Sequence, residues 1–158
     1  MSGRAAQLSE ILVPIDGSTD AKKATKAAIT IGKATGAEIV FLNVIAGHTL
    51  VMGDEAIVGN ESETTPTADD YYEAMEKLGK DIVDEAASDA KAAGVKARGM
   101  VMRAPAAVVE AIINQATKEK ADVIVMGTRG LGGFKKLLVG SVSQGVLTHA
   151  PCSVLVVR

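Results

Sequence analysis

The stretch numbered 126–144, MGTRGLGGFKKLLVGSVSQ, carries the residue types that bind anions in proteins. It contains five glycines, two adjacent lysines and two serines, and the apolar run VIVM leads into it. Glycine leaves the backbone open to close approach, and it tolerates positive φ, which costs other residues about 1–2 kcal/mol. We therefore predict a phosphate-binding loop in which Gly127 and Gly130 can take positive φ and Gly140 lets a phosphate reach the backbone.

A helix is predicted to begin at Ser141, directly after this loop. The first amides of a helix have no partner within the helix, and the helix dipole makes that end positive. Both properties favour a bound phosphate, and the hydroxyls of Ser141 and Ser143 would add donors at the same place. Lys135 and Lys136 are better explained as solvated loop charges that raise the local potential than as direct phosphate ligands.

Two common phosphate-binding motifs do not fit this loop. A Walker A loop would use Gly127 and Gly132, but Gly133 stands where that motif requires lysine. A Rossmann fingerprint would require a glycine where Lys135 stands, and it would follow the first strand rather than a late one. The spacing that fits is G-x-x-G, nine residues and then G-S, over 127–141.

Short aliphatic runs alternate with amphipathic segments along the rest of the chain. We expect strands at 10–16, 38–45, 95–102, 121–127 and 152–158, and helices at 18–36, 68–93, 104–120 and 141–149. Near-continuous aliphatic strands joined by helices predict a parallel sheet covered on both faces. The chain is therefore predicted to form a single α/β domain over 1–158, doubly wound and Rossmann-like, with a five-stranded parallel sheet.

Local signals refine these expectations. Ser18 or Thr19 can cap the first helix, and Pro105 is expected in the first turn of the third. The second helix is expected to bury one apolar face, made of Tyr72, Met75, Leu78, Ile82 and Ala86. The segment 46–67 has no clear periodicity, and we interpret it as a variable, mobile loop.

Composition limits the classes of function. The 158 residues are 47% hydrophobic but only 3% aromatic, so the core must be aliphatic. A formal net charge of −2 gives no general attraction to nucleic acid or to anionic lipid. The single cysteine, Cys152, excludes an intrachain disulfide, and no apolar run reaches the length of a membrane span. These features predict a soluble, cytoplasmic protein without nucleic-acid or membrane partners.

The order and spacing of these segments resemble the universal stress protein family, in its ATP-binding branch. ILVPIDGS, FLNVI and ADVIVMGTRG look like the family's first, second and fourth strands with their loops, and LLVGSVSQGVLTHAPCSVLVVR looks like its C-terminal helix and strand. The resemblance covers nearly the whole chain. It implies the strand order 3-2-1-4-5, which puts the first and fourth strands side by side, with a ligand crevice between them.

The resemblance also implies a bound adenine nucleotide, ATP or else AMP or ADP, with Mg²⁺ as an optional companion. Asp16 would bond the adenine or ribose, the apolar residues would pack on the adenine, and the last helix would hold the phosphates. The implied nucleotide-binding residues are Pro14, Ile15, Asp16, Val44, Met126, Gly127, Arg129, Gly130, Gly140, Ser141, Val142 and Ser143. A homodimer paired through the strand at 153–157 is implied as well.

Other interpretations of the same residues stay open. Asp16 could cap the turn that precedes the first helix, with or without a ligand contact, and the glycine loop could be a ligand-free surface loop. The sequence contains no triad and no paired carboxylates with acid–base spacing, and Asp16 alone is a candidate for phosphoryl transfer. We therefore favour a nucleotide-dependent sensor or regulator in stress response. The alternatives are a slow ATP-hydrolysing enzyme and a nucleotide-free dimeric scaffold.

Overall fold

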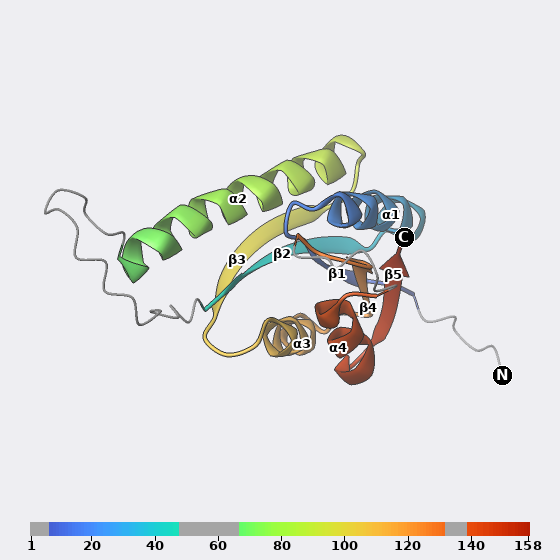
Figure 1. Cartoon of the computed structure of the whole chain (residues 1–158). Helices are drawn as coiled ribbons and strands as arrows, with labels where there is room; N and C mark the ends of the chain where they lie inside the picture. The colour runs from blue at the N-terminus through green and yellow to red at the C-terminus, as the bar shows by residue number, and fades with distance from the viewer. Residues whose placement is uncertain (1–6, 48–66, 132–138) are drawn as a thin grey trace, which may run out of the picture.

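The computed structural model describes residues 7–47, 67–131 and 139–158. Its elements are β1 (Glu10–Pro14), α1 (Thr19–Thr35), β2 (Glu38–Ala46), α2 (Ala68–Ala92), β3 (Ala97–Ala104), α3 (Val108–Glu119), β4 (Val123–Gly127), α4 (Ser141–His149) and β5 (Ser153–Val157). The five strands form one parallel sheet in the order β3-β2-β1-β4-β5 (Figure 1). The predicted fold class and strand order are thus confirmed. Most of the expected loop at 46–67, and both lysines of the glycine-rich stretch, fall outside the described residues.

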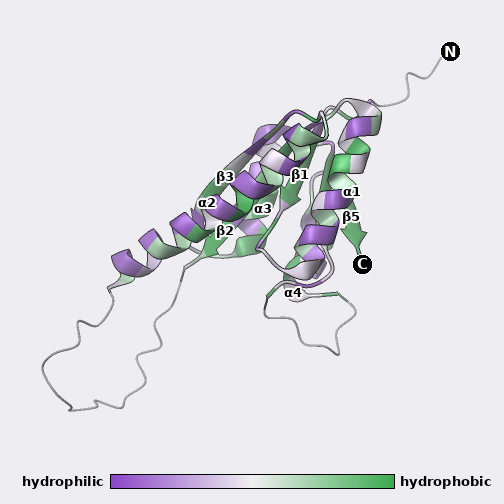
Figure 2. Cartoon of the chain, turned by 90° about the horizontal axis from the view of Figure 1, so that it is seen from above, coloured by the Kyte–Doolittle hydropathy of each residue, from purple (hydrophilic) through white to green (hydrophobic). Residues whose placement is uncertain are grey.

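The sheet lies between two pairs of helices. Helices α1 and α2 cover one face, and α3 and α4 cover the other (Figure 1). Successive residues of β1 alternate between the two cores: Ile11 and Val13 belong to the α1/α2 side, whereas Leu12 belongs to the α3/α4 side. The central strands are mainly hydrophobic, whereas β3 at the sheet edge also carries Arg98 and Arg103, and the helices show polar outer faces (Figure 2). Both aliphatic cores therefore fix the sheet, and the sheet fixes the loops at its carboxyl edge.

The ends of α1 follow their local sequence signals. The Ser18 hydroxyl accepts a hydrogen bond from the Ala21 N–H at 3.1 Å, as an N-cap does. Gly36 ends the helix with φ of 78°, a left-handed conformation that only glycine adopts at little cost. The predicted cap and stop of this helix are confirmed. None of the helices in the described parts of the chain is long and apolar enough to cross a membrane.

Two details differ from the sequence prediction. Helix α3 begins at Val108 with Ala107 as its N-cap, so Pro105 lies in the connection from β3 and not in the first helical turn. Helix α2 buries Gly79, Val83, Ala86, Ala87 and Ala90, whereas Leu78 is 51% exposed. The buried stripe of α2 includes small residues because the helix packs close to the sheet there. A pattern that counts only large apolar residues misses such a stripe.

A cluster of carboxylates surrounds Arg98 at the amino edge of the sheet. The Arg98 guanidinium lies 4.0 Å from Glu10 and 3.8 Å from Glu38, and it also pairs with Glu119. Burial, with the neighbouring Glu38 carboxylate as the next contribution, raises the pKa of Glu10 above its usual value. The charged form of Glu10 is therefore disfavoured in the folded chain.

Glu10→Gln is expected to raise the Tm at pH 7. A carboxyl whose pKa is higher in the folded chain than in the unfolded chain costs stability once pH exceeds the folded pKa, and glutamine removes that cost. The gain should shrink as pH falls through the raised pKa of Glu10 in the folded chain, and it should vanish below the ordinary glutamate pKa, where the folded and unfolded chains are both protonated at Glu10. Thermal unfolding from pH 4 to pH 8 measures both effects. Glu85→Gln, at an exposed position on α2, is the control, and an equal Tm change in both variants would contradict the assignment.

Candidate functional site

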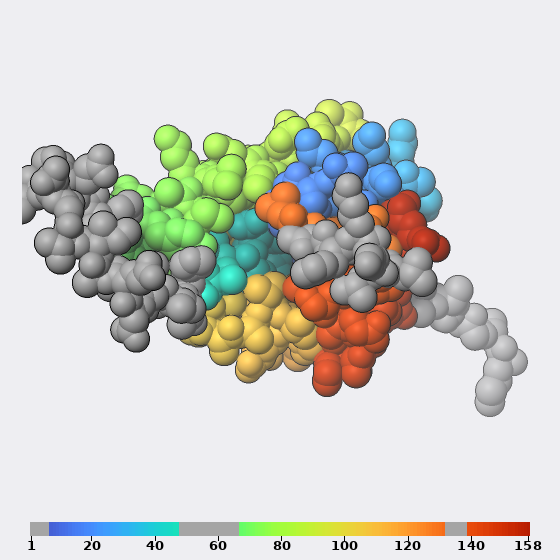
Figure 3. Space-filling view, in the orientation of Figure 1, coloured from blue at the N-terminus to red at the C-terminus, as the bar shows by residue number. Residues whose placement is uncertain are grey.

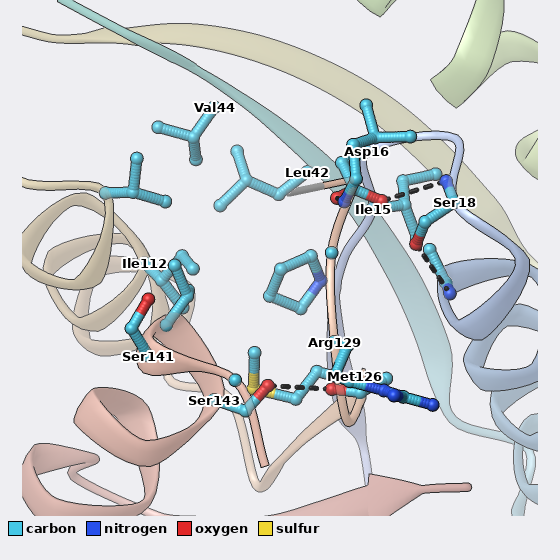
Figure 4. Close-up of a pocket in the computed structure, with 18 residues that line it drawn as sticks. Ile15, Asp16, Ser18, Leu42, Val44, Ile112, Met126, Arg129, Ser141 and Ser143 are labelled. Atoms are coloured by element: carbon cyan, nitrogen blue, oxygen red, sulfur yellow. Dashed lines mark hydrogen bonds between the residues drawn. The ribbon is translucent and has the colours of Figure 1, made fainter. Parts of the chain in front are cut away.

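A cavity of about 610 Å³ opens at the carboxyl ends of β1 and β4, where the strand order reverses (Figure 4). This is the place where open α/β sheets bind ligands. Figure 3 shows the same edge, with β2 visible between α2 and α3. All twelve predicted site residues line the cavity: Pro14, Ile15, Asp16, Val44, Met126, Gly127, Arg129, Gly130, Gly140, Ser141, Val142 and Ser143.

One wall of the cavity is aliphatic. It is built from side chains of the β1 end, β2, β4 and α3, namely Ile15, Leu42, Val44, Met126, Val108 and Ile112. Leu42 and Val44 point the same way because they are two residues apart on one strand. Such a wall, next to a few convergent polar groups, fits a flat organic ring.

Asp16 connects the β1–α1 turn to the loop after β4, on opposite sides of the cavity. Its Oδ1 accepts a hydrogen bond from the Ser18 N–H at 2.9 Å, within its own turn. Its Oδ2 accepts a hydrogen bond from the Leu131 N–H at 3.1 Å, in the loop after β4. The turn-capping interpretation of Asp16 is therefore correct, and the same carboxylate also lines the cavity. One side chain thus fixes the β1–α1 turn against the glycine-rich loop.

The glycines of this loop are required by close packing and not by positive φ. Among the described glycines, positive φ occurs at Gly17, Gly36 and Gly94, so the prediction for Gly127 and Gly130 was wrong. A Cβ added at Gly127 would lie 2.7 Å from the Asp20 carbonyl carbon, and one added at Gly130 would lie 2.6 Å from Asp16 Oδ2. Residues 127–130 therefore run directly against the first turn of α1 and against the Asp16 carboxylate.

A second carboxylate, Asp20, organises the loop from the α1 side. The Thr128 hydroxyl donates a hydrogen bond to Asp20 Oδ2 at 2.7 Å, and this bond is the main reason why the pKa of Asp20 is lowered. Arg129 Nε lies 3.8 Å from the same oxygen, and its side chain extends toward α1 (Figure 4). Arg129 is the cationic member of the described cavity lining, and it already faces an anion.

The start of α4 borders the cavity with backbone amides that lack a partner within the described parts of the chain. Gly140 is the N-cap, makes no side-chain cap, and donates its own N–H to the Thr128 carbonyl at 2.6 Å. No described residue accepts a hydrogen bond from the backbone N–H of Ser141, Val142 or Ser143. These three amides stand at the positive end of the helix dipole, as an anion site requires.

The two serines of α4 play different roles. The Ser143 hydroxyl is buried and donates a hydrogen bond to the Gly127 carbonyl at 2.8 Å, so it joins α4 to the end of β4. The expectation that Ser143 offers a free hydroxyl donor to a ligand was therefore wrong. The Ser141 side chain is exposed at the cavity mouth, and no described residue bonds its hydroxyl (Figure 4).

Few described groups outside this cavity could perform chemistry. The described residues contain no group of three or more His, Cys, Asp or Glu side chains that could hold a metal ion. Burial raises the pKa of the Cys152 thiol, which reduces the thiolate fraction at neutral pH. His149 Nδ1 lies 3.0 Å from the Gly145 carbonyl at the end of α4, where a histidine can interact with the last helical carbonyls.

Several residues of the site were not predicted from the sequence. The additional lining residues are Ser18, Ala21, Leu42, Val108, Ile112 and Leu131. Leu42 could have been found, because it shares the strand face of Val44, and Ser18 could have been found from its place two residues after Asp16. Nothing in the local sequence marks Thr128. Its hydrogen bond to Asp20 forms only because α1 packs next to the end of β4.

Comparisons with known proteins agree with this architecture. Residues 8–158 match the model of the Universal stress protein family. The chain is 32% identical over 150 residues to the universal stress protein YxiE of Bacillus subtilis, which covers 95% of this chain and 99% of the relative.

Solved structures share the fold. The universal stress protein UspA from Lactobacillus plantarum superposes with a TM-score of 0.80 at 23% identity, over 98% of this chain and all of the other. A universal stress protein from Archaeoglobus fulgidus, solved in complex with dAMP, has a TM-score of 0.65 at 18% identity, over 96% of this chain and 99% of the other. The matched family model and the extent of the curated relative together show that this chain belongs to the universal stress protein family.

Proposed function

We propose that the chain binds an adenine nucleotide in the cavity between β1 and β4 and acts as a nucleotide-dependent regulator in stress response. The observation that carries the proposal is that the amides of Ser141, Val142 and Ser143 have no hydrogen-bond acceptor among the described residues and border a cavity with an aliphatic wall. A nucleotide has the matching parts, an anionic phosphate and a flat apolar base. The Archaeoglobus fulgidus relative with bound dAMP supports a ligand of this class.

Each part of the site suits one part of the ligand. The aliphatic wall would pack against the adenine, as hydrophobic slots do with planar rings. Asp16 would accept hydrogen bonds from ribose hydroxyls. The α4 amides would hold the phosphate, and Gly140 lets the start of α4 pack on the loop after β4, where an added Cβ would lie 3.1 Å from the Thr128 carbonyl oxygen. A triphosphate would bring Mg²⁺ as its own counterion.

Binding rather than catalysis is proposed because the described site lacks the parts of a phosphoryl-transfer centre. Such a centre needs a base or a positioned water together with cationic groups that neutralise developing charge. Both oxygens of Asp16 already accept backbone hydrogen bonds, and Arg129 faces Asp20. A regulator that changes its partner affinity with bound nucleotide requires only the binding step, and the cytoplasm predicted from the sequence would supply the nucleotide.

Calorimetric titration of the purified chain with AMP and with ATP plus Mg²⁺ tests the proposal. We expect a Kd on the order of 1–100 μM for at least one of them, which corresponds to roughly −8 to −5 kcal/mol, and no measurable binding of CMP. Parallel incubation with ATP, followed by analysis for ADP, distinguishes the regulator from the slow ATPase. Absence of binding, together with no nucleotide released on denaturation, would contradict the proposal and favour the scaffold.

We also propose that the chain forms a homodimer through β5. This strand pairs only with β4 among the described strands, so its outer edge presents free backbone groups. Leu155 on β5 is 40% exposed, and no charged residue interrupts the run Ser153–Val157. An aliphatic, uncharged edge strand favours pairing with another strand.

Leu155→Lys is expected to weaken this dimer by at least about tenfold, because charge on an edge strand opposes strand pairing. Sedimentation over a range of protein concentrations measures the change. Leu155 is a better position than Val156, whose side chain packs against the core. Leu78→Lys, on the exposed side of α2, is the matched control, and an unchanged dimer in Leu155→Lys would place the interface elsewhere.

A further inference from the structure

Asn43 is a buried polar side chain directly behind the candidate site. It lies on β2 between Leu42 and Val44, is 8% exposed, and points to the opposite sheet face, which α2 covers. Its Nδ2 donates a hydrogen bond to the Ile15 carbonyl at 2.9 Å. Asn43 therefore touches the backbone of the β1–α1 turn without lining the cavity.

This hydrogen bond determines which way the next amide points. The peptide between Ile15 and Asp16 is trans, since the described residues contain no cis peptide bond. In a trans peptide the C=O and the N–H point in opposite directions. With the Ile15 carbonyl held toward β2 and Asn43, the Asp16 N–H is directed toward β4 and the cavity. No described residue accepts a hydrogen bond from this N–H.

Helix α2 holds Asn43 in place. A Cβ added at Gly79 would lie 2.4 Å from Asn43 Oδ1 and 3.0 Å from its Cγ, so the helix backbone closes directly over the amide group. A Cβ added at Gly17, in the same turn as Asp16, would lie 3.2 Å from Ile82 Cδ1 of α2. The turn that carries Asp16 is therefore supported from behind by α2 and Asn43 together.

We propose that Asn43 is a positioning residue of the nucleotide site: by fixing the Ile15 carbonyl, it presents the Asp16 N–H to the bound nucleoside. The inference rests on the proposed nucleotide function. It adds a donor to the site, so that Asp16 offers both an accepting carboxylate and a donating amide to the sugar or base. It also makes nucleotide affinity depend on the packing of α2.

Asn43→Leu tests the proposal, because leucine has a similar volume but no donor for the Ile15 carbonyl. We expect the Kd for AMP to rise about five- to tenfold, which corresponds to the loss of one net hydrogen bond to the ligand. In ¹⁵N-labelled wild-type protein, the Asp16 amide resonance should shift on addition of AMP. In Asn43→Leu that shift should be strongly reduced, whereas the amides at the start of α4 should still respond.

A matched pair of glycine variants separates positioning from general stability. In Gly79→Ala the added methyl group would lie 2.4 Å from Asn43 Oδ1. In Gly99→Ala it would lie 2.7 Å from Val83 Cβ, on the same helix α2 but away from Asn43. Both variants strain the packing of α2, so both should lower the Tm. Only Gly79→Ala is expected to weaken AMP binding, by about the same factor as Asn43→Leu. This pair also decides the question if Asn43→Leu does not fold.

The outcomes are distinguishable. If folded Asn43→Leu binds AMP as tightly as the wild type and keeps the Asp16 shift, or if Gly79→Ala and Gly99→Ala weaken binding equally, the positioning role is wrong while the nucleotide function stands. If the wild type binds neither AMP nor ATP, that result contradicts both the proposed nucleotide function and the positioning role of Asn43.

Discussion

Gly130→Val is expected to raise the Kd for AMP about 100-fold and to leave the chain folded. A Cβ at this position would lie 2.6 Å from Asp16 Oδ2, so the carboxylate must rotate away. Asp16 would then lose its bond to the Leu131 N–H and its place beside the ligand. A hydrogen bond to a charged group contributes about 1.5–3 kcal/mol, which is roughly 10- to 150-fold in affinity. Calorimetry with AMP measures the loss.

Stability should change little in Gly130→Val, because the displaced atoms are the end of a side chain and not backbone. Arg129→Ala is the neighbouring control. Its guanidinium already lies 3.8 Å from the Asp20 carboxylate, so the Kd for AMP is expected to change less than about threefold. Equal losses of affinity in the two variants would mean that Arg129 binds phosphate directly and that Asp16 is not the deciding group.

Among the proposed variants, Gly127→Val is expected to destabilise the fold most. Its free energy of unfolding should fall by about 3 kcal/mol. Here the added Cβ would meet the Asp20 backbone, at 2.7 Å from its carbonyl carbon and 2.9 Å from its oxygen. Those atoms belong to the first turn of α1 and cannot rotate away. For a chain of this length the Tm should fall by roughly 6–12 °C.

The comparison with Gly130→Val sharpens this prediction. The two glycines are only three residues apart, Gly127 at the end of β4 and Gly130 in the loop after it, yet one substitution should mainly reduce affinity and the other should mainly reduce stability. Thermal unfolding of both variants, measured without nucleotide, separates these effects. A Gly127→Val chain with the wild-type Tm would show that α1 does not pack against the end of β4 as described.

The arrangement of the sheet could be predicted because its signals are local or come with the family resemblance. Aliphatic runs marked the strands, Ser18 and Gly36 marked the ends of α1, and the order of segments implied the strand order. The crevice between β1 and β4 follows from that order, so residues in the loops after these strands could be predicted to line one cavity.

Contacts between distant segments could not be predicted. Asn43 and Gly79 are far apart in the sequence, and nothing in either segment shows that a helix backbone closes on the amide. Leu78 fits a helical apolar pattern but is exposed, because the small residue next to it makes the close contact. The positive φ expected for Gly127 was wrong for the same reason: a packing contact, invisible in local sequence, requires that glycine.

We propose that the amides at the start of α4, which no described residue bonds, hold the phosphate of an adenine nucleotide. Titration of ¹⁵N-labelled wild-type protein with AMP, followed by amide chemical shifts, tests it most directly. We expect the largest shifts at Ser141, Val142 and Ser143, and much smaller shifts there with adenosine, which lacks the phosphate. Saturable AMP binding that leaves these three amides unchanged would contradict it.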